Sequence, residues 1–400
     1  MAEETAAPAP KAEAAPKEWS KPETPVRMLP FEETEPEPTD GIGLCLSGGG
    51  YRAMIFHLGA LRRLNEAGWL ARLDRVSSVS GGSIAAAQLA LAWERLGFGE
   101  DGVAANLEDE VVEPVRELAR HTIDVAAVLR GVLGPETIAE RAAATYDRRL
   151  FGDATLQDLP DEPRFVFNAT SVQTGGLWRF GKDYMADWRV GRVREPDVPV
   201  ADAVAASAGF PPVLSPFVLD LRQADWVTDE WNHLTEGGFR DRVVLSDGGV
   251  YDNLGLETAW KRCRTILVSD AGGQLEFETA PDRDWARHAV RSAKLVDQQV
   301  RDLRKRQVIG AYVRDERDGS YWGIRSDVTH YELPDALPCH AEATLALAEV
   351  PTRLARMSDL LQERLMNWGY AVCDAAMRAH VDNSLPAPAD FPYPAAGVGE

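Results

Sequence analysis

The chain contains 400 residues, of which 45% are hydrophobic and 26% are charged. These proportions are those of a globular protein with a full core, and they exclude a wholly disordered or fibrous chain. The 63 acidic residues outnumber the 43 basic ones and give a formal net charge of −20. This balance disfavours a nucleic-acid-binding protein, because such a protein needs a basic surface.

The sequence also restricts the cellular setting. No run of about 18 apolar residues predicts a transmembrane helix, and the N-terminal segment lacks the apolar stretch of a signal peptide. We therefore expect a cytoplasmic protein whose contact with a membrane surface, if it makes one, is peripheral. The four cysteines are widely spaced, which predicts reduced thiols rather than a disulfide framework or a zinc site.

Residues 1–40 differ in composition from the rest of the chain. They hold eight of the 25 prolines, and ten acidic residues against four basic ones. Such a segment buries too little apolar surface to offset the entropy lost on ordering. We therefore predict a disordered tail over 1–40.

Ordered structure is predicted to begin with a strand over 41–47, followed by Gly48-Gly49-Gly50 and a helix over 53–67. Three consecutive glycines allow a turn whose N–H groups converge on one point, where an anion can bind. No Lys-Ser or Lys-Thr follows, which excludes a P-loop, and the G-x-G-x-x-G dinucleotide pattern is absent. Either an oxyanion hole or a phosphate site fits the loop.

Arg52 lies in the first turn of the predicted helix, where its positive charge is unfavourable for the helix dipole. A functional interpretation is that Arg52 orients the glycine loop or contacts a substrate phosphate. A structural ion pair is the alternative.

A second strand over 75–79 leads into Ser80-Gly81-Gly82 and a helix over 84–96. A serine on a sharp turn between a strand and a helix has an exposed hydroxyl and lies at the positive end of the helix dipole, as a nucleophile requires. The turn needs small residues two positions before and after the serine. Ser78 stands where glycine is usual. The alternative interpretation is a glycine-rich turn whose serine only caps the helix, because it gives the same sequence pattern.

The next elements are predicted from apolar periodicity and from glycine and proline breaks. The segment Asp220–Arg242, which is rich in tryptophan and acidic residues, is either a hairpin over a site or a surface loop pinned by its aromatic side chains. The predicted elements are helices at 107–148, strands at 164–168 and 177–180, a helix at 201–208, and strands at 243–246 and 265–269.

Asp247 follows the strand at 243–246 and precedes two glycines. A carboxylate at the carboxyl edge of a sheet lies where sites form in α/β proteins, and there it can take the proton of Ser80. An aspartate that begins a turn is the alternative. The alternation of strands and helices predicts a three-layer α/β/α sandwich with a mostly parallel sheet.

In this order, the three motifs resemble those of the patatin-like phospholipase family, which has a G-G-G-x-R-[GA] loop, a G-x-S-x-G turn and a D-G-[GA] motif. The chain matches the first at 48–53 and the third at 247–249, and it departs from the second only at Ser78. Segments 167–175 and 205–212 are also similar to the family's. The resemblance covers about 42–272.

This resemblance implies a patatin-like fold and a serine–aspartate dyad without a catalytic histidine. Ser80 would be the nucleophile, Asp247 the base, and the N–H groups of Gly48, Gly49 and Gly50 the oxyanion hole. The implied reaction is hydrolysis of a phospholipid or another long-chain acyl ester through an acyl-enzyme intermediate. No cofactor and no metal are implied.

Other interpretations remain open from the sequence. The same dyad serves acyltransferases and thioesterases, and a catalytically silent scaffold that binds acyl chains or a partner would keep the fold. A nucleotide-phosphate binder would use the glycine loop alone. A serine–aspartate–histidine triad would need His288, which lies within a predicted helix, or His57, for which packing or solvent exposure is expected.

The last part of the chain is predicted to be mainly helical, at 281–307 and 341–378. Residues 283–306 carry eight basic and three acidic residues beside an apolar stripe, so this helix either lies on an anionic membrane or packs on the core with its arginines facing carboxylates. We predict a tail at 1–40, a catalytic domain at 41–275 with a helical cap at about 107–148, a helical extension at 276–385 packed on that domain, and a coil at 386–400.

Overall fold

The computed structural model describes residues 38–123, 137–211, 214–229 and 232–399. The chain from Pro38 onward forms one compact unit. The predicted tail lies outside the described residues except for 38–40, of which Thr39 and Asp40 belong to the first strand. Residues 124–136 of the predicted helical cap also lie outside them.

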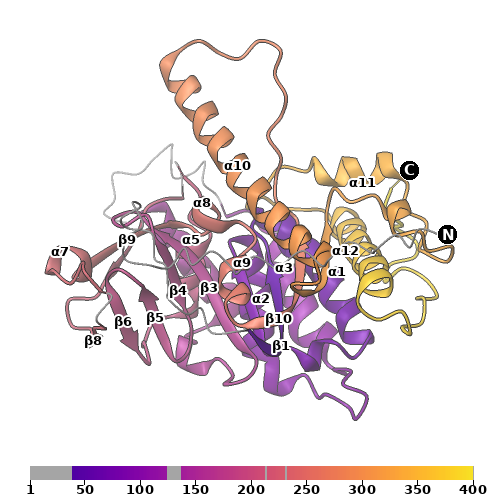
Figure 1. Cartoon of the computed structure of the whole chain (residues 1–400), viewed down its shortest axis with the longest axis horizontal. Helices are drawn as coiled ribbons and strands as arrows, with labels where there is room; N and C mark the ends of the chain where they lie inside the picture. Colours follow the sequence, from indigo (N-terminus) through magenta and orange to yellow (C-terminus); the bar gives the residue numbers. More distant parts are fainter. Residues whose placement is uncertain (1–37, 124–136, 212–213, 230–231, 400) are drawn as a thin grey trace, which may run out of the picture. The chain divides into compact units, whose positions relative to one another are not determined.

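An 11-stranded mixed sheet runs through the unit, and its first part is a parallel block in the order β11–β10–β1–β2–β3 (Figure 1). In β1, β2, β3 and β10 the last four residues are buried, as expected of strands covered on both faces. Their bounds are Thr39–Leu46 (β1), Arg75–Val79 (β2), Arg164–Ser171 (β3), Cys263–Asp270 (β10) and Asp318–Gly323 (β11).

Beyond β3 the strands pair antiparallel. Strand β3 pairs with β4 on one side and with β2 and then β9 on the other, so the sheet branches there. The bounds are Leu177–Phe180 (β4), Tyr184–Asp187 (β5), Gly191–Arg194 (β6), Phe217–Asp220 (β7), Trp226–Val227 (β8) and Arg242–Asp247 (β9).

The alternation of side chains along β1 divides the interior into two cores. Leu44 and Leu46 belong to the larger core, which includes residues of α1 (Gly50–Glu66), α2 (Gly81–Ala92) and α12 (Asp359–His380). Cys45 points to the other face and packs with Leu256 of α9 (Leu256–Trp260) and Val308 of α10 (Trp285–Val313). Helices therefore cover both faces, which confirms the predicted three-layer α/β/α sandwich.

The remaining helices are short. The predicted helical stretch at 107–148 is represented by α3 and α5, which flank residues outside the described part of the chain. The bounds are Glu113–Ala119 (α3), Ile138–Tyr146 (α5), Val200–Ser207 (α6), Gly237–Arg240 (α7), Gly249–Asp252 (α8) and Ala341–Ala348 (α11).

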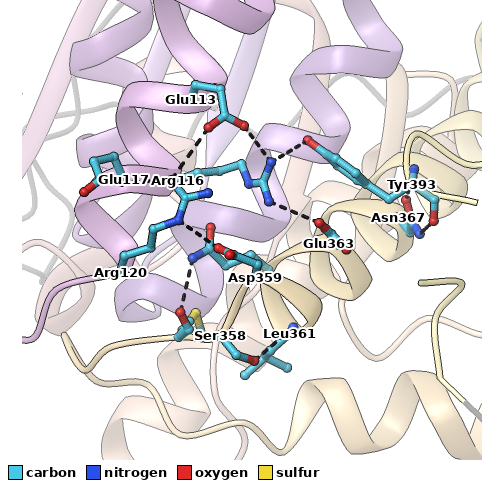
Figure 2. Close-up of polar contacts among 12 residues, drawn as sticks. Glu113, Arg116, Glu117, Arg120, Ser358, Asp359, Leu361, Glu363, Asn367 and Tyr393 are labelled. Carbon is cyan, nitrogen blue, oxygen red and sulfur yellow. Dashed lines mark hydrogen bonds and ion pairs between the residues drawn. The ribbon is translucent and has the colours of Figure 1, made fainter. Parts of the chain in front are cut away.

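Polar contacts join α3 to the C-terminal helix α12 (Figure 2). Arg120 donates to Asp359 in the first turn of α12 at 2.8 Å, and Arg116 donates to the hydroxyl of Tyr393 at 3.2 Å and to Glu363 at 3.4 Å. Arg116 is 6% exposed, so its contacts act with less solvent screening than surface ion pairs do. Residues far beyond the resemblance thus pack on the part of the chain that carries the motifs.

Candidate active site

Ser80 lies between β2 and α2 with φ 53° and ψ −121°. A non-glycine residue at this φ is strained, and such strain persists only where the surroundings fix the turn. Gly82 supplies the close approach that the turn needs, since a Cβ there would lie 2.4 Å from the carbonyl oxygen of Leu46. The turn therefore has the geometry of a nucleophile elbow.

A chain of serine hydroxyls supports the backbone of this turn. The Ser207 hydroxyl donates to the Asn168 carbonyl at 2.7 Å, so it must accept from its two other partners, the Ser80 N–H at 3.0 Å and the Ser83 hydroxyl at 2.9 Å. Ser83 in turn accepts from Ser78 at 3.0 Å. The serine that replaces the usual glycine at position 78 is thus buried and hydrogen-bonded in the network beneath Ser80.

Asp247 lies beside Ser80 because of strand register. Asn168 of β3 pairs with Val79, and the next residue, Ala169, pairs with Asp247 on the same side of β3, because β4 pairs with both residues on the opposite side. Asp247 is the last residue of β9, as expected of a strand end, and this strand runs antiparallel to β3. The expected proximity to Ser80 is also present, since the Ser80 hydroxyl is near enough to lower the pKa of the Asp247 carboxyl.

Burial sets the acidity of Asp247, whose residue is 2% exposed. It raises the pKa of Asp247 to about 7, although hydrogen bonds from the Gly249 N–H, at 2.7 Å, and from Ser80 act to lower it. A carboxylate with a pKa near neutrality can take a proton and return it within one catalytic cycle.

The three glycines of the loop differ in what their N–H groups do. Gly48 donates to the carbonyl of Asn253 at 3.1 Å, so the N–H predicted for the oxyanion hole is already used there. Gly49 and Gly50 have φ of 148° and 59°, which turns the chain sharply. Among the described residues, their N–H groups have no hydrogen-bond partner, so these two remain as oxyanion donors.

Arg52 is 3% exposed and its guanidinium contacts backbone only. It donates to the carbonyls of Ala348 and Val350, at 2.5 and 2.8 Å, and to that of Ala271 at 2.8 Å. Burial lowers the pKa of Arg52 to about 10, which still leaves it protonated at neutral pH. The loop-orienting interpretation fits this geometry, whereas a substrate phosphate would find the guanidinium already occupied.

Arg52 joins the glycine loop to residues 348–353, here called the C-terminal strap. The Tyr51 N–H donates to the Arg353 carbonyl at 3.1 Å. A Cβ on Gly50 would lie 2.9 Å from the same carbonyl oxygen. The strap therefore fixes the loop at Gly50 and Tyr51.

Neither histidine considered for a triad is placed as a base. His57 is fully buried, its Nε2 must carry the proton it donates to the Ser47 carbonyl, and its Nδ1 accepts from Ser269. Burial lowers the pKa of His57 to about 4, so the ring is neutral and structural. His288 lies in the exposed first half of α10. In the described part of the chain, no group of His, Cys, Asp and Glu residues could hold a metal ion.

The patatin-like phospholipase model matches residues 44–260, a span that contains the glycine loop, Ser80 and Asp247. The chain belongs to this family. The strap and all of α10, α11 and α12 lie outside the span that the family model matches. No curated protein matches the chain.

Solved structures similar to the chain include human GIVD cytosolic phospholipase A2 in complex with methyl gamma-linolenyl fluorophosphonate, with 14% identity, a TM-score of 0.45, and coverage of 85% of this chain and 58% of that one. VipD from Legionella pneumophila matches with 16% identity, a TM-score of 0.34, and coverage of 86% and 67%. Another structure of the human enzyme matches with 13% identity and a TM-score of 0.40, and the match covers 58% of this chain and 43% of that one.

Two supporting features were not predicted from the sequence. Ser207 lies in the segment 205–212 that resembles the family, but its spacing gives no sign that it accepts from the Ser80 N–H. Nothing in residues 348–353 indicates contact with a loop 300 positions earlier.

Among the described residues, no helix is both long and apolar enough to cross a bilayer.

Proposed function

We propose that the protein is a serine lipid acyl hydrolase of the phospholipase A or lysophospholipase type. The observation that carries the proposal is that Ser80, on its strained turn, lies next to the buried carboxyl of Asp247, with two glycine N–H groups nearby that have no hydrogen-bond partner among the described residues. Its substrate would be a phospholipid or another long-chain acyl ester. The four cysteines are free and buried, which supports a reducing, cytoplasmic location.

In the first step, Asp247 takes the proton of the Ser80 hydroxyl as its oxygen attacks the ester carbonyl carbon. The oxyanion that forms is stabilised by the N–H groups of Gly49 and Gly50 and by the N-terminal end of α2. Protonated Asp247 then gives its proton to the leaving alcohol, and the acyl group stays on Ser80. Water, deprotonated by Asp247, releases the fatty acid by the same route.

The strap and Arg52 act on this reaction indirectly. Their contacts hold the loop so that the two N–H groups are in place before the substrate arrives. Preorganised donors of this kind contribute more than mobile ones, because they need no rearrangement as charge develops. Arg52 is therefore a positioning residue in this scheme.

The test is turnover of soluble and long-chain acyl esters by wild type, Ser80→Ala and Asp247→Asn. We expect no turnover above background in either variant. Ser77→Ala is the matched control, because it removes a buried hydroxyl of β2 that donates to the Gly255 carbonyl. Turnover that survives in Ser80→Ala would exclude Ser80 as the nucleophile. Product analysis with an added alcohol separates hydrolysis from acyl transfer.

A further inference from the structure

The second half of helix α10 is anchored beside the candidate active site. Lys305 pairs with the buried Asp270 at 2.8 Å, Arg304 pairs with Glu257 at 3.0 Å, and Val308 is fully buried. Arg301 donates to the carbonyl of Gly273. The arginines that the sequence offers for an anionic membrane thus largely face the protein itself.

The first half of α10 and the segment before it are exposed rather than anchored, and they extend away from the sheet (Figure 1). Residues 281–290 are all exposed. Phe277 is 94% and Trp285 85% exposed, although large aromatic side chains normally contribute most to protein cores. The exposed large hydrophobic residues of this part are Phe277, Trp285, Val290, Leu295 and Val296, and Leu303, Ile309 and Val313 are exposed further along α10.

Helical spacing aligns part of this set. Trp285, Val296 and Leu303 are separated by eleven and seven residues, which are close to whole numbers of turns. They therefore form one outward stripe, and the anchoring residues Arg304 and Val308 lie on another side of the helix. An amphipathic helix with Trp, Val and Leu along one side is suited to the interface of a lipid layer.

The charges around the stripe nearly cancel, which favours docking through its apolar side chains. Residues 275–300 carry five acidic and four basic side chains, in a chain whose formal net charge is −20. Arg287 pairs with Asp282 at 3.3 Å and Arg291 with Glu278 at 2.7 Å. This region is therefore repelled less by lipid phosphates than the rest of the acidic chain is, and it has no basic patch that would bind them.

The stripe also lies close to the reacting groups. Asp297 and Arg301 of α10 are near enough for their charges to act on Asp247, and Arg304 lies 3.9 Å from Asp252, which follows Asp247 by five residues. A lipid layer that contacts the stripe would thus be held next to the site.

We propose that Phe277 and the outward stripe of α10 insert into the surface of a phospholipid bilayer and hold the site against its lipid substrate. This inference rests on the proposed function for the identity of the substrate. Because insertion is apolar, binding should not require anionic lipid and should persist at high salt.

The experiment is cosedimentation with phosphatidylcholine vesicles at low and high salt, in the Ser80→Ala background so that no lipid is hydrolysed. The test variant is Phe277→Ser/Trp285→Ser/Val296→Ser. The control variant is Leu345→Ser/Leu360→Ser, which removes apolar side chains that are 45% and 49% exposed on α11 and α12. We expect the test variant to lower the partition coefficient by about tenfold or more per aromatic side chain removed, and the control to bind like the parent.

Three results would overturn the inference: no vesicle binding by the parent, equal binding by parent and test variant, or a parent dimer that the test variant converts to a monomer without loss of vesicle binding. Turnover of a short soluble ester separates this inference from the proposed function. The triple substitution, made on wild type, should leave that turnover unchanged. If wild type lacks turnover on soluble and long-chain esters alike while vesicle binding behaves as expected, the proposed function fails and the surface assignment stands.

Discussion

Asp247→Asn should make the protein more stable at neutral and alkaline pH while it abolishes activity. The pKa of Asp247 is raised from 3.8 to about 7 by burial, so the folded state holds this proton more tightly than the unfolded state does. The stabilisation is fully present below the unfolded pKa and is lost as the pH rises through about 7. A shift of this size corresponds to about 4 kcal/mol, at about 1.36 kcal/mol per pH unit.

Asparagine is close in shape to the protonated carboxyl and cannot ionise, so it avoids this loss. Its advantage over aspartate in free energy of unfolding should be near zero in strong acid and greatest above about pH 7. Between about pH 5 and pH 8 the advantage should grow by about 3 kcal/mol.

The assay is urea denaturation of wild type and Asp247→Asn at both pH values, with the difference in free energy of unfolding as the readout. Ser80→Ala is the control, because it keeps the buried carboxylate and removes a donor to it. That variant should lose stability relative to wild type at pH 8. An advantage of Asp247→Asn that does not grow with pH would show that Asp247 ionises like an exposed carboxyl, and would refute this reasoning.

Three further outcomes follow from the site. The kcat/KM for a soluble ester should rise about tenfold per pH unit below about pH 7 and then level off, because Asp247 must be ionised; a rate independent of pH between 5 and 8 would contradict this. Gly50→Ala, with φ 59° and the Arg353 carbonyl 2.9 Å from the new Cβ, should lower kcat by about 10²–10³-fold relative to wild type; full activity would remove the loop from the oxyanion hole. Arg52→Met should lower the free energy of unfolding by about 2–4 kcal/mol, since three backbone carbonyls lose a charged donor. It should also lower kcat more than it changes KM. A loss of stability with unchanged kcat would show that Arg52 stabilises the fold without positioning the glycine loop for catalysis.

The sequence predicts four strands of the parallel block, β1, β2, β3 and β10, from their apolar residues and the breaks that follow them. The fifth strand, β11, was not predicted, because its sequence DGSYWG has only two large apolar side chains. The expected strands at 75–79 and 177–180 coincide with β2 and β4, and the others differ by a few residues at their ends. The antiparallel strands β5 to β8 were not predicted, since they are two to four residues long and carry polar side chains at the sheet edge. The segment Asp220–Arg242 proves to contribute β8 to that edge, where Trp226 packs on Trp178.

The candidate site was predictable in its residues and less so in its construction. Local motifs identify Ser80 and Asp247 because each occupies a glycine-flanked strand end. Their contact depends on the pairing of β9 with β3, which is a long-range feature that spacing does not encode. The engagement of Gly48 by Asn253 and the burial of Arg52 under the strap are likewise tertiary effects, visible only once distant segments are packed together.

The central claim is that Ser80 is the nucleophile of an acyl hydrolase. Reaction of wild type with a fluorophosphonate, followed by mass spectrometry of the digested chain, tests it most directly, because the reagent forms a stable bond only with an activated serine. The account predicts one adduct per chain, on the peptide that contains Ser80, absent in Ser80→Ala and formed much more slowly in Asp247→Asn. An adduct on another residue that persists in Ser80→Ala, or no adduct on a wild-type chain that hydrolyses esters, would contradict the account.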